Sequence, residues 1–186
     1  AALLTDADVG VRRAAVQALS RSPEGTPTFY TDLDFADPQT APPDLTTSSR
    51  YRQAISTTWP VFKLAPGIEP TTVQPLMEQL APIRHTFRLA MLRSKGEVAV
   101  TLPEPQVVDL LTEIGVPLVR AHISLEDGLH MSYPGQGGYP QDYDPRQRAW
   151  YGETMGTTGP NWGEPYRDTL GQGMLLPCTM SLFDAE

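Results

Sequence analysis

Cysteine is almost absent from this 186-residue sequence, which contains only Cys178. An internal disulfide needs two cysteines and a cysteine-rich zinc site needs more than one, so the sequence excludes both. Long apolar runs are absent too, since no window approaches the roughly 20 apolar residues that a membrane-spanning helix requires. The first residues also lack the basic and then apolar layout of a signal peptide.

Basic residues are scarce relative to acidic ones, with 14 Lys and Arg against 22 Asp and Glu and a formal net charge of -8. Such a charge repels phosphate backbones and anionic lipid surfaces, so nucleic acid is not a predicted partner. Proline and glycine are plentiful, at 19 and 15 residues. They predict many turns and few long helices, in a chain whose length suits one domain.

The first patterned segment, residues 5–21, has an apolar stripe at helical spacing that includes Val11, Ala14 and Leu19. Its order of acidic residues, Val-Arg-Arg and alanines resembles the second helix of a HEAT-type repeat. One repeat cannot bury its own apolar face, and the sequence shows no second copy. For residues 1–22 we therefore predict a HEAT-like helix, or an amphipathic helix packed on the next domain or on a neighbour.

Residues 23–50 are rich in proline and predict a linker or a long surface loop. Within them, residues 29–35 nearly alternate between apolar and polar and predict a short strand. Residues 59–67 are apolar but contain two prolines, so we expect ordered, irregular chain there rather than a central strand. We assign residues 51–186 to one folded domain.

Helical spacing returns over residues 71–95, whose apolar stripe would cover one side of a sheet. Pro82 must kink or split this helix. A second helix is predicted over residues 105–114, with Gly115 at its end. The sequence thus predicts two helical segments before any well-marked strand.

A β-hairpin is predicted next, because an Asp-Gly pair lies between the apolar runs 116–124 and 129–133. His122 and His130 fall on its two strands and can approach one another. A metal site needs a third ligand, and no further histidine, cysteine or acidic cluster stands at metal-ligand spacing. We therefore predict no metal site.

The densest mixture of aromatic and charged side chains lies in residues 141–168. Asp144 and Pro145 are typical of a helix start, so a short helix is predicted over residues 146–155. A further strand is predicted over residues 174–183. Together with the hairpin, these elements indicate an antiparallel α+β fold.

This stretch resembles a known family. The run Tyr-Asp-Pro-Arg-Gln-Arg-Ala-Trp-Tyr that begins at Tyr143, followed by Pro-Tyr-Arg-Asp at 165–168, resembles the signature of Cache sensor domains of the double-Cache type. These are PAS-like extracytoplasmic modules of chemoreceptors and histidine kinases. The resemblance covers residues 116–183. It implies a PAS-like antiparallel sheet with a long N-terminal helix, here residues 71–95, and a short helix after the central hairpin.

The resemblance also implies a binding site. In the amino-acid-binding members of the family, a tyrosine, an arginine, a tryptophan and a second tyrosine mark the pocket at the spacing found here. It implies that Arg148, with Trp150, grips a carboxylate, while Tyr166 and Asp168 line the pocket and help to hold an ammonium group. The predicted ligand-binding residues are Tyr143, Arg148, Trp150, Tyr151, Tyr166 and Asp168. The family carries another ligand-binding aspartate on a later strand, so we expect a domain that is incomplete at its C-terminal end.

The chemistry of these residues agrees with carboxylate recognition, because a guanidinium bonds a carboxylate with two parallel hydrogen bonds. The alternative is that the Arg and aromatic cluster is structural and pins the short helix to the sheet, in a protein-interaction or scaffold module. No Ser-His-Asp grouping, metal cluster or phosphate-binding loop is present, so we predict neither an enzyme nor a cofactor.

The predicted function is that of a sensor domain of a signal-transduction protein, which recognises a small carboxylate such as an amino acid or an organic acid. The resemblance implies a periplasmic or extracellular location. The sequence begins at Ala1 rather than Met, so we expect a segment of a longer protein whose membrane anchor lies outside it. A homodimer is an open alternative.

Overall fold

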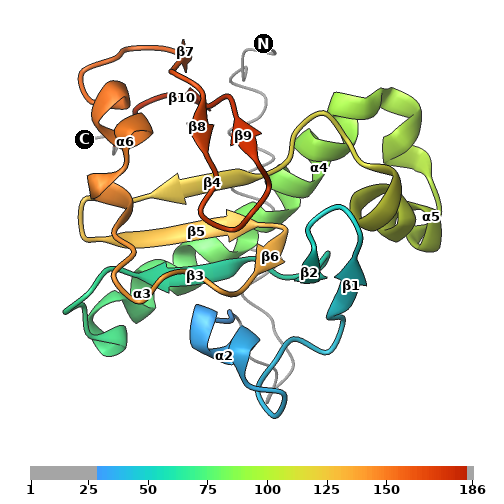
Figure 1. Ribbon diagram of the computed structural model, residues 1–186, viewed down its shortest axis with the longest axis horizontal. Helices are drawn as coiled ribbons and strands as arrows, with labels where there is room; N and C mark the ends of the chain where they lie inside the picture. The colour runs from blue at the N-terminus through green and yellow to red at the C-terminus, as the bar shows by residue number, and fades with distance from the viewer. Residues whose placement is uncertain (1–28, 184–186) are drawn as a thin grey trace.

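The computed structural model describes residues 29–183. This part of the chain combines small antiparallel sheets with several helices (Figure 1), which confirms the mixed α and β class predicted from the sequence. The segment 5–21, predicted as a HEAT-like helix, lies outside the described residues.

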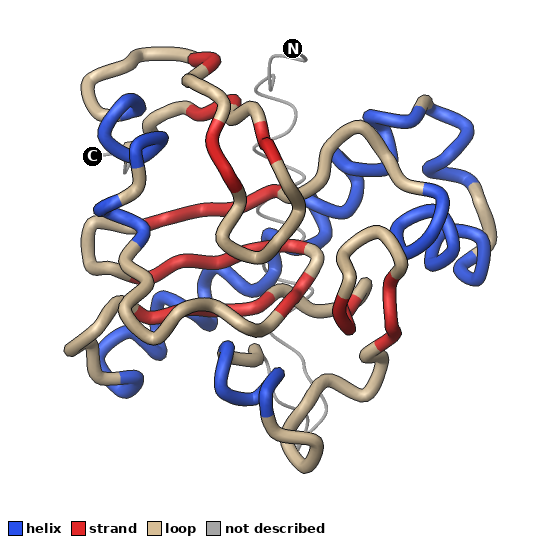
Figure 2. The backbone as a smooth tube through the Cα atoms, in the orientation of Figure 1, coloured by secondary structure: helices blue, strands red, loops and turns tan. Residues whose placement is uncertain are grey.

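Most elements are short. The helices are α2 (Asp32–Ala36), α3 (Pro70–Leu80), α4 (Arg84–Lys95), α5 (Glu104–Asp109) and α6 (Ala149–Thr154). The strands are β1 (Thr46–Ser48), β2 (Gln53–Ser56), β3 (Val61–Leu64), β4 (Ala121–Ser124), β5 (Leu129–Tyr133), β6 (Gly135–Gln136), β7 (Asn161–Trp162), β8 (Tyr166–Arg167), β9 (Met174–Leu175) and β10 (Cys178–Thr179). Loops, drawn tan in Figure 2, connect many of them, as the proline and glycine content predicts.

The central sheet has the strand order β3-β5-β4, and both pairings are antiparallel. Strand β5 lies in the middle, where Ser132 is paired with Val61 on one side and His122 on the other. Because side chains alternate along a strand, Leu129 and Met131 face one side of the sheet and Ser132 the other. The sheet therefore has an apolar face and a polar face.

Helices α3 and α4 cover the apolar face and lie behind the sheet in Figure 1. Phe62 and Met131 of the sheet pack there with Val73 and Met77 of α3, and all four side chains are buried. Burial of a large apolar side chain contributes about 1.5–3 kcal/mol, so this layer holds the helices to the sheet. A second cluster joins α4 and α5 around Met91.

The helical prediction over residues 71–95 is confirmed in its extent and in its interruption at Pro82. Helix α3 ends at Leu80, a 3-10 turn spans Ala81–Ile83, and α4 begins at Arg84. Proline lacks the amide hydrogen that a continuous helix needs, which explains the break. The single long helix implied by the Cache resemblance is therefore divided in two.

Two other local predictions are confirmed. Helix α5 continues into a π-helical turn, Leu110–Ile114, which ends at Gly115 with φ +88°. Strands β4 and β5 form the predicted hairpin around Gly128, whose φ of +81° is easily adopted only without a Cβ atom.

Three predictions are wrong in the type of structure. Residues 29–35 contain α2 rather than a strand, because the amide and hydroxyl of Thr31 both donate to Asp34 and start a helix. Residues 59–67 contain β3, an edge strand flanked by proline rather than irregular chain. The single strand predicted over residues 174–183 is replaced by β9 and β10, with Pro177 between them.

Gly135 of β6 lies against the chain before β3. A Cβ atom at this position would clash with the Trp59 carbonyl oxygen and the Phe35 ring. The Gly135 amide also donates to Trp59 O at 3.0 Å, so the two backbones are held together. We expect Gly135→Ala to lower the free energy of unfolding by about 1–3 kcal/mol, as other overpacked substitutions do, and urea denaturation measures this change.

Gly152 of α6 provides the matched control, since no atom lies within 4 Å of a Cβ added there. Gly152→Ala should leave stability unchanged or raise it by up to about 1 kcal/mol, because alanine favours a helix. Equal denaturation midpoints for the two variants would contradict the close contact at Gly135.

Candidate functional site: the polar face of the central sheet

The polar face of the central sheet carries His122 of β4 with His130 and Ser132 of β5. Three aromatic side chains from the segment after β6 cover this face: Tyr139, Tyr143 and Trp150. The β8–β9 hairpin lies over the same side of the sheet, in front of it in Figure 1. The region 141–168 that stood out in the sequence thus packs on a layer of polar sheet residues.

The two histidine rings of this face pack against the aromatic rings that cover it. The His122 and Trp150 ring centroids lie 4.6 Å apart, and those of His130 and Tyr143 lie 5.5 Å apart. Burial, aided by the nearby Arg120 charge, lowers the pKa of His122 to about 4, and burial also holds the pKa of His130 well below its ordinary value. Both imidazoles are therefore neutral at pH 7.

The two histidines approach one another as the sequence suggested, with ring centroids 5.2 Å apart. Residues 29–183 contain no group of three His, Cys, Asp or Glu side chains that could hold a metal ion. His130 instead shares a hydrogen bond of 2.8 Å with Ser124 through Nδ1. Within the described chain, the two histidines pack against the aromatic side chains that cover the sheet.

Arg120, immediately before β4, is a site residue that the sequence did not reveal. Its guanidinium donates to Asp168 Oδ1 at 3.1 Å and to Gln136 Oε1 at 2.8 Å. The Arg120 and Asp168 side chains retain only 9% and 2% of their exposure. This ion pair fastens the β8–β9 hairpin to the sheet.

Three buried polar atoms in this region have no hydrogen-bond partner among the described residues: Arg120 Nε, Gln136 Nε2 and Ser132 Oγ. Buried polar groups are normally paired, because an unpaired one loses its hydration without compensation. All three can donate a hydrogen bond. The polar face is therefore rich in donors.

Arg148 stands at the edge of this region, before α6. It is half-buried, and its guanidinium carbon lies 6.0 Å from the centroid of the Tyr143 ring. Its side chain makes no ion pair or hydrogen bond within residues 29–183. A depression of about 170 Å³ opens beside it, lined by Pro140, Asp142, Tyr143, Asp144, Gln147, Arg148 and Thr169. Burial raises the pKa of Tyr143, so its hydroxyl stays neutral.

Asp144 and Arg146 brace the loop that carries Arg148. Asp144 Oδ1 accepts from the Arg146 amide and Nε, both at 2.9 Å, and Oδ2 accepts from the Arg146 guanidinium at 2.7 Å. These bonds lower the pKa of Asp144, which caps the 3-10 turn Pro145–Gln147. Helix α6 begins only at Ala149, so the single helix predicted over residues 146–155 is divided at Arg148. Arg146 also donates to the Glu126 carbonyl in the β4–β5 turn.

The structure brings only some of the predicted ligand-binding residues to the depression. Tyr143 and Arg148 line it, whereas Asp168 and Tyr166 do not. The pKa of Tyr166 is raised first by burial and then by the Asp168 charge. Trp150 is turned onto His122 of the sheet. Tyr151 packs edge-on against Trp150, at 6.1 Å between ring centroids, and does not line the depression.

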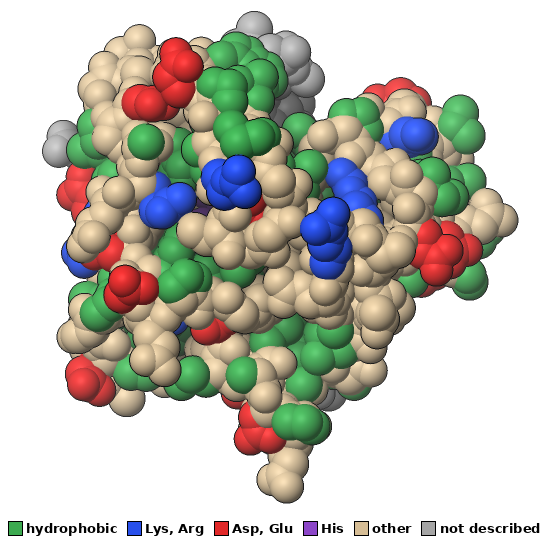
Figure 3. Space-filling model, viewed as in Figure 1, with side chains coloured by type: hydrophobic (Ala, Val, Ile, Leu, Met, Phe, Trp, Pro, Cys, Tyr) green, Lys and Arg blue, Asp and Glu red, His purple; other side chains and the backbone are tan. Residues whose placement is uncertain are grey.

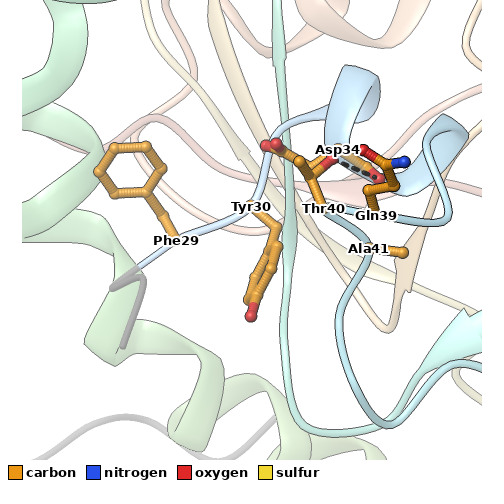
Figure 4. A pocket seen from close by; sticks show the side chains of 6 residues that line it. All are labelled: Phe29, Tyr30, Asp34, Gln39, Thr40 and Ala41. Atoms are coloured by element: carbon orange, nitrogen blue, oxygen red, sulfur yellow. Dashed lines mark hydrogen bonds between the residues drawn. The ribbon is translucent and has the colours of Figure 1, made fainter. Parts of the chain in front are cut away.

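A larger depression of about 360 Å³ lies on another part of the surface, at α2. Its lining residues are Phe29, Tyr30, Asp34, Gln39, Thr40 and Ala41 (Figure 4). None of these is a cation, and Asp34 is already used in capping α2. By contrast, Figure 3 shows Lys and Arg side chains over the region between α6 and the β8–β9 hairpin. The Arg148 depression is therefore a better candidate for an anion-binding site than the depression at α2.

Comparison with known proteins gives no relative, since no family model, curated protein or solved structure matches the chain. Among the helices of residues 29–183, none has the length and apolar character to cross a membrane.

Proposed function

We propose that this chain contains a ligand-binding sensor domain of a signal-transduction protein, which recognises a small carboxylate such as an amino acid or an organic acid. The observation that carries the proposal is Arg148, a half-buried guanidinium at a depression with no carboxylate partner in the described chain. A guanidinium bonds a carboxylate through two parallel hydrogen bonds, and each hydrogen bond to a charged group contributes about 1.5–3 kcal/mol.

The neighbouring arginines support this assignment by contrast. Arg120 is paired with Asp168, and Arg146 is paired with Asp144. Of the three, only Arg148 has no ion-pair partner within residues 29–183, so its donors are available to an external group. The depression of about 170 Å³ is smaller than the roughly 300–1,000 Å³ of sites for drug-sized ligands, which favours a ligand of few heavy atoms.

The wider proposal is a PAS-like, Cache-type domain, supported by an antiparallel sheet with helices on one face and the candidate site on the other. The proposed location is extracytoplasmic, in a longer protein anchored to a membrane by a segment outside residues 1–186. The domain is proposed to signal without catalysis and without a cofactor. Its signal would follow from a conformational change of the loop that carries Arg148, which Arg146 connects to the β4–β5 turn by a hydrogen bond.

The test is a thermal-shift screen of small carboxylates on the wild-type chain and on Arg148→Ala. At 100 times its Kd, a ligand raises the free energy of unfolding by about 2.7 kcal/mol. For a chain of this size, that increase raises Tm by about 5–10 °C. Arg148→Ala should abolish the shift, because the carboxylate loses its guanidinium partner.

Arg167→Ala is the matched control, since it removes the same charge from an exposed position on β8. It should keep the shift. If no small carboxylate raises Tm, or if Arg148→Ala responds like the wild type, then binding at this depression is disproved.

A second candidate function, a protein-interaction or scaffold module, is favoured by one observation. Large apolar side chains are exposed on the C-terminal segment: Trp162, Met174, Leu176, Met180, Leu182 and Phe183. Exposed apolar groups of this kind often mark interaction surfaces. The absence of any thermal response to carboxylates, together with self-association in analytical ultracentrifugation, would favour this function.

A further inference from the structure

We propose that the Arg148 depression selects small carboxylates that carry no ammonium group, because Arg120 already occupies the carboxylate of Asp168. This inference rests on the proposed function and narrows its ligand from amino or organic acids to organic acids. The expectation from the family resemblance was the opposite one, with Asp168 helping to hold an ammonium group.

Both oxygens of Asp168 are used inside the protein. Oδ1 accepts from the Arg120 guanidinium at 3.1 Å, and Oδ2 accepts from the backbone amide of Gln172 at 3.1 Å. Its side chain retains 2% of its exposure. A ligand ammonium would have to displace Arg120, which would leave that guanidinium buried without its carboxylate.

The acids that line the depression do not replace Asp168. Asp144 accepts three hydrogen bonds from Arg146, so both of its oxygens are occupied. Asp142 is exposed on the loop, where water and salt weaken its attraction for a cation. No buried carboxylate is therefore left for an ammonium group among the residues that line this depression.

The local charge also disfavours a cation. Arg148 stands at the depression, so an ammonium next to the bound carboxylate would meet like charge. It would also give up hydration without gaining a buried carboxylate as its acceptor.

Propionate and alanine form a matched pair of probes, since alanine is propionate with an ammonium group on its second carbon. Isothermal titration and thermal shift on the wild-type chain should show propionate binding, with alanine at least about tenfold weaker. Alanine binding as tightly as propionate would overturn the selectivity while leaving the proposed function intact. If neither compound binds and no other carboxylate shifts Tm, the proposed function fails as well.

Two variants test the reason for the selectivity. Asp168→Asn and Asp142→Asn each remove one candidate partner for an ammonium, so the ratio of the alanine and propionate Kd values should stay within about twofold of wild type for both. A selective loss of alanine binding in either variant would identify that aspartate as an ammonium acceptor and overturn the inference. Asp142 is exposed, so its variant serves even if Asp168→Asn does not fold.

Discussion

Replacing Arg120 by methionine should lower the free energy of unfolding by about 3–5 kcal/mol, the usual effect of removing one partner of a buried ion pair. The methionine keeps an unbranched apolar stem but leaves Asp168 as a buried charge with no cation. Gln136 Oε1 loses its donor in the same substitution. Urea denaturation followed by tryptophan fluorescence measures the change.

An exposed pair gives the control. Arg93 and Glu97 form an ion pair at 3.6 Å on the end of α4, where their side chains are 56% and 81% exposed. Arg93→Met should therefore change stability by no more than about 1 kcal/mol. Adding Asp168→Asn to Arg120→Met should recover part of the loss, because it removes the stranded charge. Equal effects of Arg120→Met and Arg93→Met would show that the buried pair does not hold the hairpin.

Lowering the pH from 7.5 to 5.5 should destabilise the protein by about 1.4 kcal/mol for each of His122 and His130. Their pKa values in the folded state lie below the ordinary value of 6.5, at about 4 for His122. Below pH 6.5 these two histidines bind protons in the unfolded chain but stay neutral in the folded chain. Stability is thus complete above pH 6.5 and falls as the pH drops toward 4.

Single-residue variants separate this effect from general acid denaturation. His122→Phe keeps a ring against Trp150 but cannot titrate, so it should remove about half of the loss between pH 7.5 and 5.5. His85 is exposed on α4, and His85→Gln should leave most of the loss in place. A loss of stability that is the same in His122→Phe as in the wild type would show that this imidazole is not buried in its neutral form.

The elements that the sequence predicted well are those fixed by near neighbours. Pro82 divides a helix wherever the sheet lies, and Asp144 and Pro145 start a helical turn without help from distant residues. Helix α2 could have been found in the same way, because Thr31 and Asp34 have the spacing of a capping box. In residues 29–35 this local signal outweighs the near-alternation of apolar and polar residues that is typical of a strand.

The parts that the sequence did not predict depend on distant partners. Strand β3 exists because it pairs with β5, and its two flanking prolines only confine it to the edge. In the site, spacing pointed to Tyr143 and Arg148, but Arg120 became visible only through its bond to Asp168, 48 residues later. The direction of Trp150, onto the sheet rather than into the depression, also follows from tertiary packing.

The pairing of β3 with β5 has a consequence for how the site is assembled during folding. Val61 meets Ser132 and Leu64 meets Leu129, so the intervening chain must close into a long loop before these contacts form. Such non-local contacts slow folding, because the entropy of the loop is lost before the contacts repay it. Tyr143 packs on Val61. A fragment that begins after β3 would therefore contain every predicted binding residue yet lack the strand that carries Val61.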